Sequence, residues 1–453
     1  MSGPAQFPPI AFAKRARSML LAVATGVALA DSSVVTLALP DLLTRFAVDI
    51  TTVAWVLTSY NLVLAAAAVP AAYLARRRPV VAFVAGALVF AAACLACGLA
   101  GTFGVLVGAR CVQAAGGALV IVAALDLLTE SEGSHARAAR VWAAAGIVGA
   151  ALGPAAGGIL TATLGWESIF LLQAPLALVP LAAVAGVATR PPRAPAGRPH
   201  LGANLALLLL SGGLVGALFL LVVLLVDGWR MSPAAAGLVV TVMPLAAIAA
   251  GRLASRAGTI LIRAAAGSVL VAGGLCALAL LPRAGWGWTM PPQLLAGAGI
   301  GLTLAALSER ALAGRSAQAV HGGWTIASRH AGVVLGLLLL SPIFASALER
   351  NQDEGLRAGA ATVVDSRIPP VDKLGVAQAV LVQVDRAGGQ VPDIAPAFAD
   401  RPHTGEYRSL LAALEDQLDR AVTDAFSNPF FLAATLALAA LIPLWLGRRK
   451  GGL

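Results

Sequence analysis

Charged residues are scarce in this sequence. Only 12% of its 453 residues are Asp, Glu, Lys or Arg, against about 25% in an average soluble protein. Hydrophobic residues make up 59%, and the mean hydropathy is +0.85. Such a chain has too few polar side chains to cover a water-soluble fold of this length. The sequence therefore predicts an integral membrane protein.

Several functional signatures are also missing. No G-x-x-x-x-G-K-[ST] phosphate-binding loop occurs, which argues against ATP hydrolysis by the chain. His, Asp and Glu do not cluster at one face of the predicted membrane region, so we expect no enzyme activity, no metal and no cofactor. The formal charge of +10 comes without a basic aromatic surface or a nucleic-acid motif, and we expect no nucleic-acid partner.

Cysteines are few, and all four lie inside apolar runs: Cys94, Cys97, Cys111 and Cys276. Cys94 and Cys97 form a C-x-x-C pair. A redox or zinc site would need polar access and, for zinc, further ligands. We therefore interpret these cysteines as residues of helix packing.

Long apolar runs dominate the remainder. A transmembrane helix needs about 20 predominantly apolar residues, and the chain holds twelve such runs with mostly short connections. They cover roughly 18–40, 51–75, 79–100, 103–127, 140–162, 167–188, 203–226, 233–254, 259–281, 289–312, 320–345 and 429–446. The sequence thus predicts an all-α polytopic membrane protein with twelve transmembrane helices, in which sequence neighbours pack antiparallel.

The basic residues orient these helices, because cytoplasmic loops are enriched in Lys and Arg. With the N-terminus inside, the inner segments hold nineteen of the 32 basic residues and the short outer loops only three, Arg45, Arg230 and Arg283. We therefore expect both termini in the cytoplasm and the protein in the plasma (inner) membrane. The N-terminal "AKRARS" leads directly into a full-length span, so we expect no cleavable signal.

A Pro- and Arg-rich segment divides the spans into two sets of six. We predict a six-helix bundle over 1–188, a cytoplasmic linker over 189–202, a second bundle over 203–446 and a cytoplasmic tail over 447–453. The halves echo each other in the basic turns "AAYLARRRP" (71–79) and "GRLASRAG" (251–258). Two related halves with a substrate site between them are typical of secondary transporters.

One outer segment, residues 346–428 between spans 11 and 12, is long and acidic. It contains 13 of the 22 acidic residues and 8 of the 32 basic ones, a net charge of −5. We predict a helix capped by Thr404 that carries Leu410, Leu414 and Phe426 on one face, and a weaker helix over about 374–386. Two interpretations stay open: a solvated decoration, or a cap or binding element.

Residues Gly146–Leu160, "GIVGAALGPAAGGIL", combine several glycines with a proline inside a predicted span. Each interior Gly costs about 1 kcal/mol relative to Ala in a soluble helix, and Pro about 3. Small residues at four-residue spacing allow two helix backbones to approach closely in lipid. The run therefore predicts a tightly packed helix face.

These motifs give the chain its resemblance to a known family. The run 146–160 is similar to the antiporter motif in the fifth span of major facilitator superfamily transporters, carried here by Gly149, Gly153, Pro154, Gly157 and Gly158. Four further stretches resemble patterns of its drug:proton antiporter branch: "ADSSVVTLALP" (30–40), "WVLTSYNL" (55–62), "RCVQAAGGA" (110–118) and "GWESIFLLQAP" (165–175). The resemblance implies the major facilitator fold, here in a twelve-span form, and export driven by protons.

The chain departs from the family pattern between spans two and three. The family's G-x-L-A-D-R-x-G-R appears as "AYLARRRP", with Ala72 in place of the glycine and Arg76 in place of the acidic residue. Ser255 takes the acidic position in the second half, and Ala114 replaces the glycine after Gln113. A gate built on that acidic residue is therefore not expected here.

Two ionisable residues lie inside predicted spans, where charge is costly and usually functional. Asp31 lies nine residues before Pro40 and Arg110 lies seven residues into span four, so both lie about 10–13 Å from the outer end at 1.5 Å per residue. We expect the two to meet. The resemblance implies that they couple transport to protons; the alternative is a static pair that locks two helices together.

Polar residues in other spans are candidates for a substrate cavity. They are Tyr60, Asn61, Gln113, Gln293, Trp324, Arg329 and His330. His330 could also relay protons, because histidine titrates near physiological pH. Each residue has an alternative interpretation, since a lone polar side chain in a span often makes an interhelical hydrogen bond.

We therefore expect a proton-coupled secondary transporter that exports small apolar or amphipathic molecules. Its expected partners are a small-molecule substrate, protons and the lipid bilayer, and the expected oligomeric state is a monomer. Export of lipid or cell-envelope precursors, with the 346–428 segment in the exit path, is one alternative. A non-transporting membrane sensor on the same scaffold is another; a sensor would tolerate neutralisation of Asp31.

Overall fold

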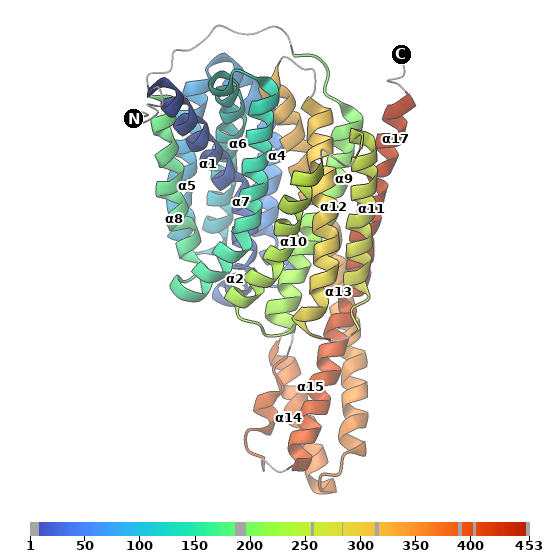
Figure 1. Ribbon diagram of the computed structural model, residues 1–453. Coiled ribbons are helices and arrows are strands. Elements are labelled where there is room, and N and C mark those ends of the chain that lie inside the picture. Colours follow the sequence, from blue (N-terminus) through green and yellow to red (C-terminus); the bar gives the residue numbers. More distant parts are fainter. Residues whose placement is uncertain are drawn as a thin grey trace, which may run out of the picture.

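A computed structural model describes residues 9–185, 196–254, 258–282, 284–312, 317–387, 392–401 and 405–449. These residues form helices joined by short connections, and no strand occurs among them. Twelve helical segments of the described chain are long and apolar enough to cross a membrane, and they match the twelve predicted spans in order. The predicted all-α architecture is therefore confirmed (Figure 1).

The first six and the last six of these membrane-crossing segments form two halves that lie side by side (Figure 1). The first half consists of α1 (Pro9–Thr36), α2 (Leu39–Phe46), α3 (Ile50–Val53), α4 (Trp55–Arg77), α5 (Pro79–Gly98), α6 (Phe103–Glu132), α7 (His135–Leu164), α8 (Glu167–Leu178) and the 3₁₀ turn η1 (Val179–Val184). The second half begins with α9 (Leu201–Val223), the π turn η2 (Leu224–Gly228), α10 (Pro233–Leu253), α11 (Ile260–Ala279) and α12 (Trp286–Leu312). It continues with α13 (Gln318–Asp365), α14 (Pro370–Ala387), the 3₁₀ turn η4 (Ala395–Phe398), α15 (Gly405–Ala425), α16 (Ser427–Ala439) and α17 (Leu441–Arg449).

Local sequence signals set several helix ends. The Thr102 side chain accepts a hydrogen bond from the Val105 amide at the start of α6, and Gly133 ends that helix in the left-handed conformation at φ +63°. Ser134 then caps α7. Because only these two residues separate α6 from α7, the two helices run antiparallel. The first half of the predicted linker 189–202, residues 189–195, lies outside the described residues, as does Ser255.

The first span ends earlier than expected. Helix α1 stops at Thr36, and Pro40 lies in the first turn of α2 rather than at the end of the span. Proline is favoured at that position because its missing N–H is not needed there. Asp31 is therefore only five residues from the end of its helix, and α2 lies beyond that end.

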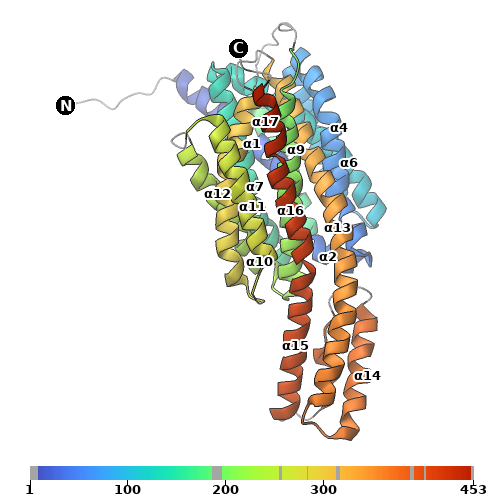
Figure 2. The same ribbon diagram turned by 90° about the vertical axis from the view of Figure 1, so that its right-hand side faces the viewer.

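The segment between spans 11 and 12 is a helical insert that prolongs both spans. Helix α13 does not end near residue 345 but continues to Asp365, and α15 leads into α16 with a single residue between them. The insert projects from the end of the bundle opposite the start of α1 (Figures 1 and 2). Helices α14 and α15 confirm the two predicted helices, while Thr404 lies outside the described residues. The insert has its own apolar core, built on Val363, Val376, Ile394, Phe398, Leu410 and Leu414.

Candidate functional site

A buried ion pair joins α1 to α6. Arg110 Nη1 donates to Asp31 Oδ2, and both side chains are fully buried. The predicted meeting of these residues is therefore confirmed, although Asp31 lies nearer its helix end than the sequence indicated. An ion pair that is buried away from water needs further hydrogen-bonding partners. The surrounding side chains supply these partners.

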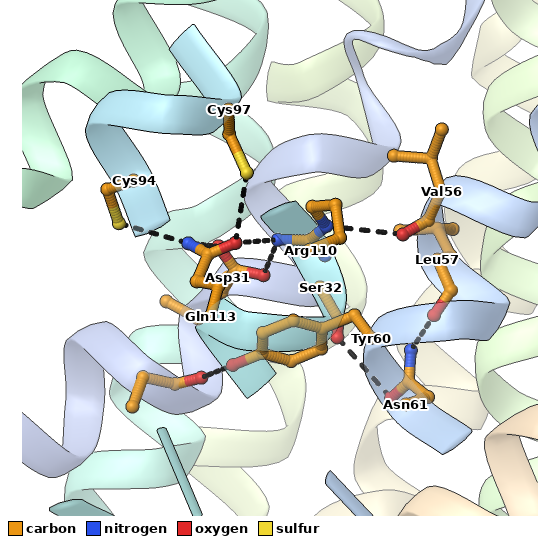
Figure 3. Close-up of polar contacts among 12 residues, drawn as sticks. Asp31, Ser32, Val56, Leu57, Tyr60, Asn61, Cys94, Cys97, Arg110 and Gln113 are labelled. Carbon is orange, nitrogen blue, oxygen red and sulfur yellow. Dashed lines mark hydrogen bonds and ion pairs between the residues drawn. The ribbon is translucent and has the colours of Figure 1, made fainter. Parts of the chain in front are cut away.

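Gln113 completes the pair. It lies three residues after Arg110 on α6, so both side chains project from the same face. Its Oε1 accepts from Arg110 Nη1 at 2.7 Å, and its Nε2 donates to Asp31 Oδ1 at 3.0 Å (Figure 3). Expected in a substrate cavity, Gln113 instead bridges the two charges and is itself fully buried.

The guanidinium of Arg110 also contacts α4 and α8. Its Nε donates to the Val56 carbonyl at 3.2 Å. Its Cζ lies 4.2 Å from the ring centroid of Tyr60 and 5.6 Å from that of Phe170, within the range of cation–π attraction. The Tyr60 hydroxyl donates to the Ala28 carbonyl on α1 at 2.9 Å, which fixes that ring.

Two cysteines of α5 reach the same cluster, which sequence reasoning missed. Gln113 Nε2 lies 3.1 Å from Cys94 Sγ, and Cys97 Sγ lies 3.8 Å from Gln113 Oε1 (Figure 3). The spacing of three residues places both thiols on one helix face, and that was the only available signal. These thiols fill the space between α5 and α6 and act as weak hydrogen-bonding groups.

A second polar contact crosses from one half to the other. His330 Nδ1 on α13 lies 2.6 Å from Asn61 Oδ1 on α4. Asn61 Nδ2 donates to the Leu57 carbonyl at 2.7 Å, so its Oδ1 is the acceptor and His330 Nδ1 carries the hydrogen. Ser32, the neighbour of Asp31, donates to the same Oδ1 at 3.4 Å. His330 Nε2 is buried and has no hydrogen-bond partner within the described chain.

Within the described part of the chain, the remaining predicted cavity residues make none of these contacts. Gln293 is buried on α12 and donates to Thr289 of its own helix at 3.0 Å. Trp324 is 37% exposed on α13, and Arg329 is half-buried beside His330. The structure thus brings together Tyr60 and Gln113 with the ion pair, and Asn61 with His330.

The glycine-rich face of α7 packs against α1. A Cβ at Gly149 would lie 2.3 Å from the Gly26 carbonyl oxygen, and a Cβ at Gly157 would lie 2.2 Å from that of Val34. At Gly153 it would lie 2.1 Å from Ser33 Oγ. No side chain fits at such distances, so the predicted close packing is confirmed. Asp31 lies on the segment of α1 that this face supports.

The same motif reaches the second half. A Cβ at Gly158 would lie 2.3 Å from the Pro233 carbonyl oxygen at the start of α10. In return, a Cβ at Gly237 on α10 would lie 2.5 Å from the Pro154 carbonyl oxygen. Helix α7 therefore contacts α1, the helix that carries Asp31, through one set of glycines and α10 of the second half through another.

Metal ligation finds no support in this site. Within the described residues no group of three His, Cys, Asp or Glu side chains converges as a metal site would require. The arrangement instead offers one buried carboxylate, one permanent cation and an interface between two halves.

Comparison with known proteins identifies the family. The sequence model of the Major Facilitator Superfamily matches residues 21–348. This chain belongs to the Major Facilitator Superfamily. The match ends at residue 348, close to where the insert begins.

Curated relatives are drug efflux and resistance proteins of this superfamily. Multidrug resistance protein Stp of Mycobacterium tuberculosis is 37% identical over 169 residues, which cover 35% of this chain and 31% of the relative. Methylenomycin A resistance protein of Streptomyces coelicolor is 35% identical over 169 residues, 36% of each chain. The chain thus spans about a third of the length of the curated relatives it matches. They agree with the drug:proton antiporter branch indicated by the motifs.

Solved structures support the major facilitator fold. A bacterial homologue of the human lysosomal transporter Spinster, in an inward-facing and unoccupied conformation, superposes with a TM-score of 0.65 at 16% identity and 99% coverage of both chains. A POT family transporter in complex with 5-aminolevulinic acid gives 0.62 at 11% identity, with 96% coverage of both chains. At these identities the likeness concerns the fold alone.

Proposed function

We propose that this transporter exports small apolar or amphipathic molecules across the plasma membrane in exchange for protons. The observation that carries the proposal is the fully buried Asp31, held by Arg110 and Gln113. A carboxylate in a membrane bundle is costly and is retained mainly where it serves ion or proton movement. The drug-resistance relatives support efflux as the direction.

Asp31 is the proton-binding group in this scheme. In the present conformation Arg110 Nη1 and Gln113 Nε2 both donate hydrogen bonds to the Asp31 carboxylate. When α1 and α6 separate enough to move Arg110 away, the carboxylate loses its compensating charge. An unpaired buried carboxylate is energetically costly, and binding a proton neutralises it. Alternating between these two settings couples proton movement to the rearrangement of the halves.

The substrate passes between the halves, where His330 and Asn61 meet. His330 Nε2 is an unpartnered buried atom within the described chain and offers an acceptor to a substrate donor group. Tyr60, Gln293, Trp324 and Arg329 complete the proposed lining. We further propose cytoplasmic termini, on the basis of the basic inner loops, and a monomer as the working unit.

The Asp31→Asn variant tests the proposal in proteoliposomes loaded with ethidium as probe. With an imposed pH gradient, we expect uphill ethidium movement to fall to the level of empty liposomes, because Asn cannot carry a proton. Downhill ethidium equilibration should persist, since the asparagine retains the shape of the site. Uphill transport by Asp31→Asn at the wild-type rate would exclude Asp31 as the coupling group.

Two controls separate coupling from structural damage. Asp31→Asn leaves Arg110 as an unpaired buried charge, which costs about 3–5 kcal/mol, so the double variant Asp31→Asn/Arg110→Gln removes both charges together. Asp372→Asn breaks a partly exposed pair with Arg401 in the insert, where the N–O distance is 3.3 Å, and should leave transport unchanged. Loss of downhill and uphill movement alike in the folded double variant would favour the static pair.

A further inference from the structure

The insert contains an apolar cavity of about 120 Å³ between α13, α14 and α15. Aliphatic side chains dominate its walls: Val363, Val380, Val384, Ile394, Leu414 and Leu418. Among the residues whose side chains the structure describes, no ionisable one lines the cavity. The cavity is partly open to the outside, so a ligand can enter without unfolding the insert.

Small residues keep this space open. Gly359 on α13 and Ala377 on α14 lie on its walls. A Cβ added at Gly359 would lie in ordinary contact with Leu414 Cδ2, at 3.4 Å, and 4.0 Å from Gln417 Oε1. A larger side chain at position 359 would therefore occupy the cavity rather than displace a helix.

Gln417 on α15 supplies a polar group with a free acceptor. Thr362 donates to the Ala358 carbonyl at 3.0 Å, so its hydroxyl oxygen can only accept from Gln417 Nε2, which lies at 2.6 Å. This fixes the orientation of the amide. Gln417 Oε1 is then shielded from water and without a partner among the described residues. A buried acceptor without a partner is destabilising, and a bound donor would satisfy it.

The cavity has a fixed position relative to the bundle. Trp229 Nε1, just after η2, donates to Thr423 Oγ1 at 3.1 Å. Arg230 donates to Asp393 Oδ1 at 3.0 Å and to the carbonyl oxygen of the cavity residue Pro392 at 2.8 Å. Val422, another wall residue, belongs to an apolar core that residues of the transmembrane bundle also form. The insert is thus tied to the bundle rather than tethered loosely.

We propose that the insert binds a small neutral molecule with an apolar body and one hydrogen-bond donor. The apolar body occupies the cavity, and a hydroxyl or amide N–H donates to Gln417 Oε1. An apolar protein cavity of about 150 Å³ takes up benzene; this one is smaller, at about 120 Å³, but partly open, so it suits a slim chain of about six carbons better than a ring. This site lies outside the membrane helices and goes beyond the proposed function, because it requires neither proton coupling nor a direction of transport.

A diazirine-bearing hexanol provides the test, applied to the full chain in nanodiscs and mapped by mass spectrometry after illumination. We expect saturable labelling on peptides containing Gly359, Ala377 and Gln417, competed by 1-hexanol. The cavity-filling variants Gly359→Leu and Ala377→Leu should lower this labelling about tenfold, the equivalent of ~1.4 kcal/mol. Ala412→Leu, at an exposed position of α15, is the matched control and should label like the wild type.

The polar contact has its own test. The wild type should bind the diazirine hexanol better than its methyl ether, which has no donor, and Gln417→Met should bind the two equally. Labelling confined to the membrane helices, or undiminished by both filling variants, would overturn the site. Equal labelling of the alcohol and the ether by the wild type would overturn the role of Gln417.

Discussion

Arg110 contacts three other helices through different parts of one guanidinium group. Nη1 faces Asp31 of α1, Nε faces the Val56 carbonyl of α4, and the planar face lies against Tyr60 of α4 and Phe170 of α8. A lysine ammonium carries the same charge but has neither the fork of donors nor the flat surface. The site therefore depends on the shape of arginine as well as on its charge.

The Arg110→Lys variant tests that dependence. We expect it to lose most proton-driven ethidium efflux and to melt several degrees lower, because Val56 and Gln113 each lose a buried hydrogen bond worth about 1 kcal/mol. Arg17→Lys is the control: Arg17 is partly exposed and lies 3.9 Å from Glu130, so no change is expected. Thermal melting followed by tryptophan fluorescence measures the stability of both variants, and the liposome assay measures their efflux. A fully active Arg110→Lys protein would show that charge alone suffices.

At this scale the sequence predicted the pair but not its surroundings. Counting residues from the helix ends placed Asp31 and Arg110 at similar depth, because the rise per residue of a helix is fixed. The spacing of three residues to Arg110 was enough to place Gln113 beside the pair, but Cys94 had no such reference. Helix α5 is apolar nearly all round, so no polar stripe indicates which of its faces points inward.

Helix α7 packs closely because its contact face carries glycines instead of residues with larger side chains. At Gly149 and Gly157 its backbone lies directly against the backbone of α1, and Gly158 lets α10 approach from the other half. Such contacts give close van der Waals packing over a narrow surface, which is the main source of helix association in lipid. Any movement of α7 relative to α1 therefore shifts two closely packed backbones along each other near Asp31.

The Gly153→Leu variant tests this packing. Because even a Cβ would lie 2.1 Å from Ser33 Oγ, we expect α1 and α7 to be forced apart, transport to stop and the melting temperature to fall. Overpacking of this kind costs typically about 1–3 kcal/mol. Ala156→Leu, on the exposed face of the same helix, should behave like the wild type in both assays. Normal efflux by Gly153→Leu would mean that this helix contact is dispensable.

The helices of the insert illustrate a different limit of sequence reading. The apolar stripe of α15 has a helical period and predicted that helix within a few residues. The continuation of α13 to Asp365 was missed, because hydropathy drops after Ala347 where acidic residues begin. Hydropathy reports where a helix leaves the membrane. The backbone hydrogen bonds that continue it do not depend on lipid.

On the scale of the whole molecule, the insert extends the bundle along the direction of spans 11 and 12 (Figure 2). Its acidic character contrasts with the basic segments at the opposite end, so the molecule is electrically polarised along its long axis. The loop charges predicted this asymmetry from the sequence. The spatial relation between insert and bundle could not be predicted, because it depends on Trp229 and Arg230, which contact residues about 160 to 190 positions away.

Cysteine labelling decides the orientation that this polarity implies. In the parent variant, alanine replaces the two half-buried cysteines, Cys111 and Cys276. Two variants are then made from it: Ala412→Cys places a thiol on the exposed face of α15, and Arg137→Cys places one at the exposed start of α7. Basic loops remain in the cytoplasm, so we expect a membrane-impermeant maleimide to label Ala412→Cys in spheroplasts and Arg137→Cys only in inside-out vesicles. The buried Cys94 and Cys97 should stay unlabelled in both, which makes the parent variant the blank. The reverse pattern would place the insert in the cytoplasm. The proposed ligand cavity would then face the cell interior, and Asp31 would lie nearer the cytoplasmic end of the bundle than the outer end.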